Sequence, residues 1–309
     1  MVTSLQHSES PLFFPFDPSP PPAEVCLENV YDAFSSYPFG SGWCERCFTP
    51  ELEAEARRQR VRSAAAESFD MIYFEHPLCS GGAETFLHFL PRGLELSFFD
   101  GRLAFGLAHH FLKLGIFFWP EHEQSALRDL FCRVAISWFT EGHTAPLEGP
   151  THRTSSWILQ GDVPEYILQA LLVLRIDARS IAEWLLRTDT PAAWHGIAKV
   201  LKDPWFIEAP VYFVLGNPAE EEDCKAACEA INRLTSDGFR QVITGDVLLG
   251  KWMPASESDP GLAGLIGHLE SFLDVGTLVP RQRREDAFAV RKCVESLSSG
   301  ENSQSRLLQ

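Results

Sequence analysis

Apolar residues recur at spacings of three and four along most of the chain, which is the pattern of an α-helix with one buried side. Two segments, YILQALLVLRI at 166–176 and SIAEWLLRT at 180–188, are so densely apolar that we expect burial on most sides. VYFVLG at 211–216 is the one short run rich in β-forming residues, and alone it cannot make a sheet. The sequence therefore predicts an all-α fold, an irregular array of about a dozen helices without substantial sheet. No repeat of fixed period emerges, and an α/α-repeat-like arrangement stays open as an alternative.

Helix starts are marked by capping side chains followed by proline, since proline suits the first helical position. These pairs are Thr49–Pro50, Thr190–Pro191 and Asn217–Pro218. Capping-box spacings occur at Asp162 with Glu165 and at Asn217 with Glu220. Longer loops are expected at 146–156 and 253–259, where Gly, Pro and Ser interrupt the helical pattern.

The chain of 309 residues lies at the upper edge of what one compact core supports, which favours a main domain with a smaller addition. We expect a disordered, Pro-rich lead-in at 1–22, because this stretch ends in PSPPP. The main helical domain is then 23–250, followed by a C-terminal helical appendage at 251–298 and a disordered tail at 299–309.

The formal net charge of −16 disfavours nucleic acid and anionic lipid as partners, because phosphate binding needs a positive field. The N-terminal stretch has neither the basic nor the long apolar region of a secretory signal. The most apolar segment, GLAHHFLKLGIFFW at 106–119, is shorter than the roughly 20 residues of a membrane-spanning helix. These features predict an acidic cytoplasmic protein whose cysteines are thiols or metal ligands.

A proline interrupts the apolar run HFLPRGLEL at 88–96. Inside a helix Pro91 leaves the carbonyl of Leu87 without its amide partner. A new helix starting at Pro91 would need Leu90 as its cap, and leucine caps poorly. A continuous, kinked helix is therefore the better prediction.

If that helix continues, four polar side chains fall on one stripe about 80° wide: Glu84, His88, Arg92 and Glu95. One interpretation is an internal salt-bridged ladder that also supplies a donor to the freed carbonyl, since buried charges must be paired. The other is a binding face, with His88 as acid or base tuned by Glu84 and Arg92 holding a carboxylate or phosphate. The ladder is the favoured interpretation, because structural networks also perturb ionisable groups.

Cysteines at metal-ligand spacing flank a predicted helix. Cys44 and Cys47 form a Cys-x-x-Cys turn, and His76 with Cys79 supplies a second pair that can complete a tetrahedral zinc site. A redox dithiol and two thiols packed in a turn stay open as alternatives. The cofactor prediction is thus none, or one structural zinc.

Together these motifs resemble a family of uncharacterised bacterial proteins. Its members have a Tyr-rich helix, a Cys-x-x-Cys turn and then an acidic residue four positions before His-Phe-Leu-Pro-Arg. The matching positions here are Tyr31, Phe34, Cys44, Cys47, Glu84, His88, Phe89, Leu90, Pro91 and Arg92. The likeness extends through 117–131 and more faintly to about residue 250. It implies an all-helical fold and no activity, because none is established for that family.

The chain has no Gly-rich phosphate loop, no HExxH and no nucleophile elbow. We therefore expect a non-catalytic helical protein that acts by binding another protein. Two alternatives stay open: an enzyme or small-anion binder built on Glu84, His88 and Arg92, and a helical protein stapled by zinc. The pattern predicts no particular partner and no oligomeric state.

Overall fold

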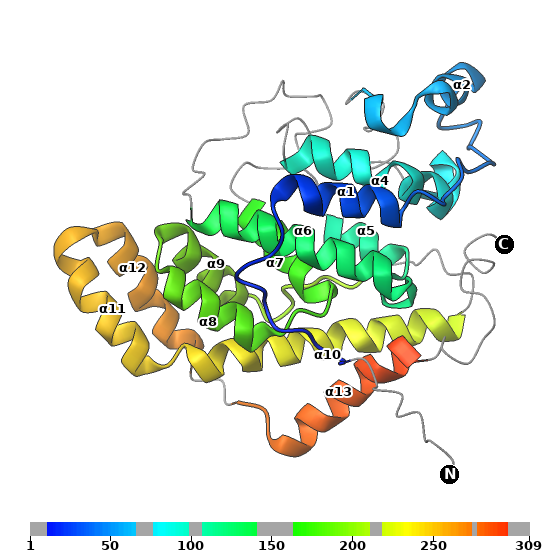
Figure 1. The fold of residues 1–309 in the computed structure, drawn as a ribbon. Helices are drawn as coiled ribbons and strands as arrows, with labels where there is room; N and C mark the ends of the chain where they lie inside the picture. Colours follow the sequence, from blue (N-terminus) through cyan, green and yellow to red (C-terminus); the bar gives the residue numbers. More distant parts are fainter. Residues whose placement is uncertain are drawn as a thin grey trace, which may run out of the picture.

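The computed structural model describes residues 11–65, 77–98, 107–140, 163–210, 218–273 and 277–295. Twelve α-helices lie in these residues and no strand longer than an isolated bridge, which confirms the predicted all-α fold (Figure 1). The strand-like run at 211–216 lies outside the described residues.

The first half of the chain contains α1 (Ala23–Ala33), α2 (Pro50–Arg58), α4 (Gly82–Phe98), α5 (Leu107–Lys113) and α6 (Glu121–Thr140). The second half contains α7 (Val163–Val173), α8 (Ala178–Thr188), α9 (Pro191–Lys202), α10 (Pro218–Val242), α11 (Gly245–Ser258), α12 (Pro260–Leu269) and α13 (Pro280–Glu295). Short 3-10 turns include η1 (Val61–Ser63) and η3 (Pro77–Ser80).

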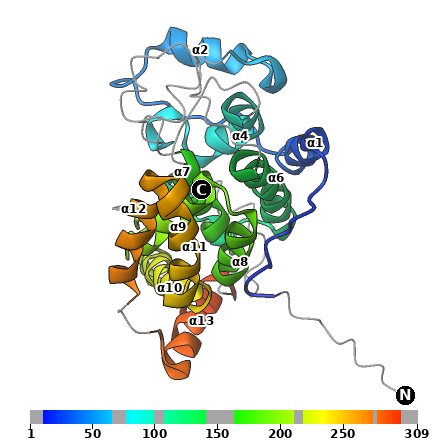
Figure 2. The same ribbon diagram turned by 90° about the vertical axis from the view of Figure 1, so that its left-hand side faces the viewer.

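Helices α6 to α10 form the centre of the molecule, and the other helices pack around them. Helix α10 runs along one side with α13 against it, and α11 and α12 form a hairpin beside α9 (Figures 1 and 2). Helix α1 lies on α6 and contacts α4. Helix α2 lies beyond α4, at the end of the molecule opposite α13 (Figures 1 and 2). The predicted domain boundary at 250 therefore falls inside α11.

The core is a single apolar cluster, with Trp194, Phe131, Phe139 and Phe239 among its largest fully buried side chains. Helix α7 is buried on most sides, as its sequence predicts. For α8 the same prediction is wrong. One face of this central helix points to solvent and carries an exposed ion pair between Arg179 and Glu183.

Two of the predicted helix starts are confirmed, since Thr49 and Thr190 cap α2 and α9 with the following proline at the first turn. Asn217 and Asp162 lie outside the described residues, as does the loop expected at 146–156. The loop expected at 253–259 is wrong, because α11 continues to Ser258. Buried Ala255 anchors that last turn, and its carbonyl accepts the Asp259 amide at 2.7 Å.

Residues 11–22 have no helix, yet they follow the surface of the bundle as an extended segment. Phe16 and Pro20 are buried there. None of the described helices is both long and apolar enough to cross a membrane.

Candidate metal centre

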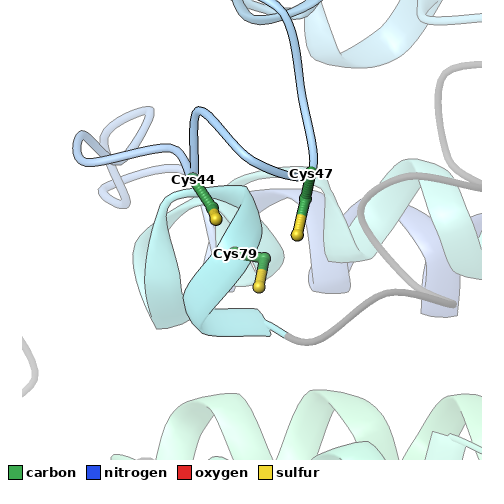
Figure 3. A group of neighbouring side chains, drawn as sticks. All are labelled: Cys44, Cys47 and Cys79. Carbon is green, nitrogen blue, oxygen red and sulfur yellow. The ribbon is translucent and has the colours of Figure 1, made fainter.

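Three cysteine side chains converge beside the N-terminal end of α4. The sulfur atoms of Cys44, Cys47 and Cys79 all lie within 4.8 Å of one another. Figure 3 shows that two of them come from the loop before α2 and that the third comes from η3. Three of the four predicted metal ligands are therefore together, whereas His76 lies outside the described residues.

The local backbone explains why the first two thiols face the third. The amides of Cys47 and Phe48 donate to the carbonyl of Cys44 at 3.0 and 2.9 Å, which folds the Cys-x-x-Cys segment into a tight turn. The amide of Cys44 donates to the carbonyl of Cys79 at 2.8 Å and ties this turn to η3. The two halves of the site are thus held by main-chain bonds that require no metal.

A buried tryptophan supports the turn from behind. Trp43 stacks on Phe39 with ring centroids 5.6 Å apart, and Phe48 meets it edge-on at 5.1 Å. Gly81 has φ +87°, and a Cβ atom there would stand 2.7 Å from the indole nitrogen of Trp43. Only glycine combines that backbone conformation with so close an approach, so Gly81 fixes the distance between turn and helix.

The groups around the thiols shift the pKa values of Cys44 and Cys47 in opposite directions. Backbone N–H groups of Arg46 and Cys47 donate to the sulfur of Cys44 and lower the pKa of its thiol. The neighbouring thiols of Cys44 and Cys79 raise the pKa of Cys47 to about 11. Backbone donors aimed at one sulfur are the arrangement that stabilises a metal-bound thiolate.

A group of three thiols at this spacing can hold a metal ion. For tetrahedral zinc, a metal–sulfur distance of about 2.3 Å places the sulfurs roughly 3.8 Å apart. The sulfurs therefore need to close by no more than about 1 Å around such an ion. Cys47 is exposed, so the site is open to solvent on one side.

The predicted polar stripe on α4 is present, and the helix is continuous through Pro91 as expected. Glu84, His88, Arg92 and Glu95 are half-buried, and the other residues of α4 are buried except Gly82 and Phe98 at its two ends. The stripe therefore marks the side of α4 that borders the N-terminal loops.

The charged end of the stripe is used in contacts within the protein. Arg92 donates to the carbonyl of Ala64 at 3.1 Å and to Glu95 at 2.6 Å, and Tyr31 donates to the same Glu95 oxygen at 2.6 Å. Arg92 is thus paired with a carboxylate and with a main-chain carbonyl, and that carbonyl belongs to Ala64 and not to Leu87. Arginine reaches across to η1 because its long side chain extends away from its own helix.

The other half of the stripe is not an acid–base pair. Nδ1 of His88 lies 2.7 Å from the carbonyl of Tyr37, so that nitrogen carries the proton and donates. Glu84 forms no ion pair with His88 or Arg92, since Arg92 pairs with Glu95. The geometry thus matches the ladder interpretation in part, with Glu84 outside it.

Two buried polar groups escaped the sequence analysis. Glu123 is fully buried and accepts a hydrogen bond from Tyr37, while Arg128 and Arg175 are buried around Glu121. The acids at 121 and 123 resemble ordinary first-turn residues of a helix. Tyr37 and Arg175 lie 86 and 54 positions from the carboxylates that they contact, so no local pattern signals these two pairs, whereas Arg128 is seven residues from Glu121 on the same helix.

No protein-family model, curated protein or solved structure matches this chain. The resemblance to a bacterial family therefore remains a prediction, and a function has to be argued from the geometry.

Proposed function

We propose that this is a zinc-stapled helical protein that acts by binding another protein. The proposed metal is supported by one observation, the convergence of the sulfur atoms of Cys44, Cys47 and Cys79. Thiolates favour zinc among the common divalent ions of cells, and a site with several cysteine ligands is typical of structural zinc. His76 is the fourth ligand we propose, because the His-x-x-Cys spacing that it forms with Cys79 is typical of zinc-ligand pairs.

Zinc would join the loop before α2 to η3 and the start of α4. Helix α2 itself contributes little apolar burial, since Ala56 is its one buried residue. A segment with so small a core gains most from a covalent or metal cross-link. The proposed role of the metal is therefore to stabilise the fold.

The metal content of the purified full-length chain tests this proposal. We expect one zinc per chain by elemental analysis, with loss of zinc and a lower melting temperature in Cys44→Ser and Cys79→Ser. Cys132→Ala removes a buried thiol elsewhere and should keep the zinc. His76→Ala should weaken zinc binding without abolishing the three-sulfur site. A wild-type chain that takes up no zinc from a buffered zinc solution would refute the proposal.

Protein binding is supported by exposed apolar side chains on α11. Leu249 and Met253 are 57% and 59% exposed on one side of that helix, and Trp252 beside them is 41% exposed. Neighbouring exposed apolar residues of this size are typical of interaction surfaces. A double variant, Leu249→Asp with Met253→Asp, should keep the melting temperature and lose any partner captured by the wild-type chain.

An enzyme centred on Glu84, His88 and Arg92 is less well supported. The guanidinium of Arg92 is held by Glu95 and Ala64, and the Nδ1 proton of His88 is held by Tyr37. Polar groups that already make such hydrogen bonds within the protein have few donors available to bind a substrate.

A further inference from the structure

The extended segment at 11–16 is bound by residues more than a hundred positions away. Its backbone pairs with the turn that follows α7 as an added strand does, forming a parallel bridge between Phe14 and Ile176. The amide of Phe14 donates to the carbonyl of Arg175 at 2.9 Å, and the carbonyl of Phe14 accepts from the amide of Asp177 at 2.7 Å. Figure 1 shows this dark-blue segment crossing the helices drawn in green. It is therefore attached in the way in which a peptide is bound by strand addition.

Two aromatic side chains anchor the segment. The guanidinium carbon of Arg128 lies 3.7 Å from the ring centroid of Phe14, and that of Arg175 lies 5.3 Å from it. Phe16 stacks on Trp184 with centroids 4.2 Å apart and an interplanar angle of 23°. Aromatic rings at alternate positions thus enter two separate subsites, one cationic and one aromatic.

The receiving surface is built to accept this segment. Arg128 and Arg175 are only 6% and 3% exposed, and Nη1 of the first and Nε of the second have no hydrogen-bond partner among the described residues. Arg175 also holds φ at +66°, a conformation unusual for a residue with a side chain, at the turn that follows α7. Without the segment, the Arg175 carbonyl and the Asp177 amide would lose their partners in a place where unpaired polar groups are costly.

Ser180 completes the groove by accepting the amide of Phe16 at 2.8 Å. The groove therefore recognises an extended Phe-Pro-Phe segment through main-chain bonds and through both rings.

The connector between this segment and α1 separates it from the rest of the chain. Residues 17–22 form no helix, and four of these six residues are proline. Proline-rich connectors are extended and stiff, and a stiff hinge next to a separable element is the setting in which identical chains exchange that element.

We propose that the groove is an interface between two copies of this chain, each receiving residues 11–16 of the other. The occupant is chosen because this segment already satisfies the groove's donors, acceptors and subsites. Exchange keeps every one of those contacts and changes only which chain supplies them. Two identical grooves and two identical segments close into a symmetric dimer with none left over.

The dimer competes with the same contacts made within one chain. The tether raises the local concentration of the segment to the order of millimolar, so exchange appears at high protein concentration or after partial unfolding. The net charge of −16 on each copy opposes association, so salt should favour the dimer. This inference is independent of the proposed zinc.

Two complementary full-length variants test the exchange. In one, Phe14→Ala with Phe16→Ala weakens the segment and leaves the groove intact. In the other, Trp184→Ala weakens the groove and leaves the segment intact. Light scattering after chromatography should show concentration-dependent dimers for the wild-type chain. Each variant alone should keep a similar dissociation constant, because its substitution weakens the same contact in the closed monomer and in the exchanged dimer. Their mixture should form heterodimers, since it still contains one intact segment and one intact groove.

Phe288→Ala is the matched control, because it removes an exposed aromatic ring elsewhere and should leave dimerisation unchanged. Circular dichroism establishes that each variant is folded. If a variant fails to fold, a synthetic peptide of residues 12–19, LFFPFDPS, gives a second measurement on the wild-type chain. The peptide should convert dimers to peptide-bound monomers, and a peptide of scrambled sequence should not.

Two results would overturn the proposal. One is a wild-type chain that stays monomeric up to about millimolar concentration, with no heterodimer in the mixed variants. The other is a monomer at every concentration that binds the free peptide, since the groove would then serve a segment of a different protein.

Discussion

The buried carboxyl group of Glu123 should make the stability of the fold depend on pH. Glu123 lies fully buried in the first turn of α6, and its carboxyl oxygens are 2.9 and 3.1 Å from the hydroxyl of Tyr37. Burial raises the pKa of Glu123 from 4.5 to about 7, and the hydrogen bond from Tyr37 opposes this rise only in part. Below about pH 7 the folded protein therefore holds this group in its neutral form.

The size of the effect follows from the two pKa values. Between pH 4.5 and 7 the unfolded chain releases the proton of Glu123 while the folded protein keeps it. Each pH unit in this window lowers the free energy of unfolding by about 1.4 kcal/mol, or about 3 kcal/mol across the 2.5 units. This contribution to stability is complete below pH 4.5 and is lost as the pH rises through 7.

Glu123→Gln isolates the effect, because the amide is neutral at every pH and has nearly the same shape. Urea unfolding followed by tryptophan fluorescence, from pH 4.5 to 8.5, gives the free energy of unfolding of both proteins. We expect the variant to gain on the wild-type protein by about 3 kcal/mol as the pH rises, with the difference becoming constant above about pH 7. Glu24→Gln, at an exposed position in α1, should show no such gain. A difference between Glu123→Gln and the wild type that is independent of pH would refute the reasoning.

Other properties follow from the caps, the stripe and the helix content. Arg92→Ala should lower the free energy of unfolding by about 1–3 kcal/mol, because it leaves Glu95 without its cation. Glu84→Ala on the same face should change it by less than about 0.5 kcal/mol, and equal losses in urea titrations would contradict the ladder. Thr190→Ala removes the cap of α9 and should cost about 1 kcal/mol, so an unchanged melting temperature would contradict the cap. Far-ultraviolet circular dichroism should be mainly helical, and a strand-dominated spectrum would contradict the fold.

The helical part of the fold could be predicted because its causes are local. Thr49 and Thr190 precede prolines, and the capping bonds they make span only three residues. Pro91 was compatible with a continuous helix because the apolar spacing persists on both of its sides. At α8 the density of apolar residues does not lead to the predicted burial on most sides, because one face of this helix carries the exposed pair Arg179–Glu183.

The candidate metal site could be predicted because its residue types are chemically distinctive. Cysteines three apart in a turn are typical of metal sites and can be recognised without knowledge of their tertiary surroundings. What the sequence could not supply is the bond from Cys44 to Cys79 and the close approach of Gly81 to Trp43. Both depend on segments brought together by the fold, and the same holds for Phe14 between two arginines.

The polar stripe of α4 and the thiol cluster both lie where residues 37–65 are attached to the helical bundle. Residues 37–65 contain little helix and few buried side chains, so apolar packing alone attaches them weakly to the bundle. Main-chain groups in this stretch are instead bound by α4 or by the turn before it: Tyr37 by His88, Gly40 by Thr85, Cys44 by Cys79 and Ala64 by Arg92. Three of these bonds fall within residues 37–44 and the fourth lies at Ala64, so they attach the two ends of the stretch. The half-buried face that suggested a binding surface in the sequence is thus the face on which the chain's own N-terminal loops are held. The zinc that we propose would add a metal-dependent attachment at the point where that face begins.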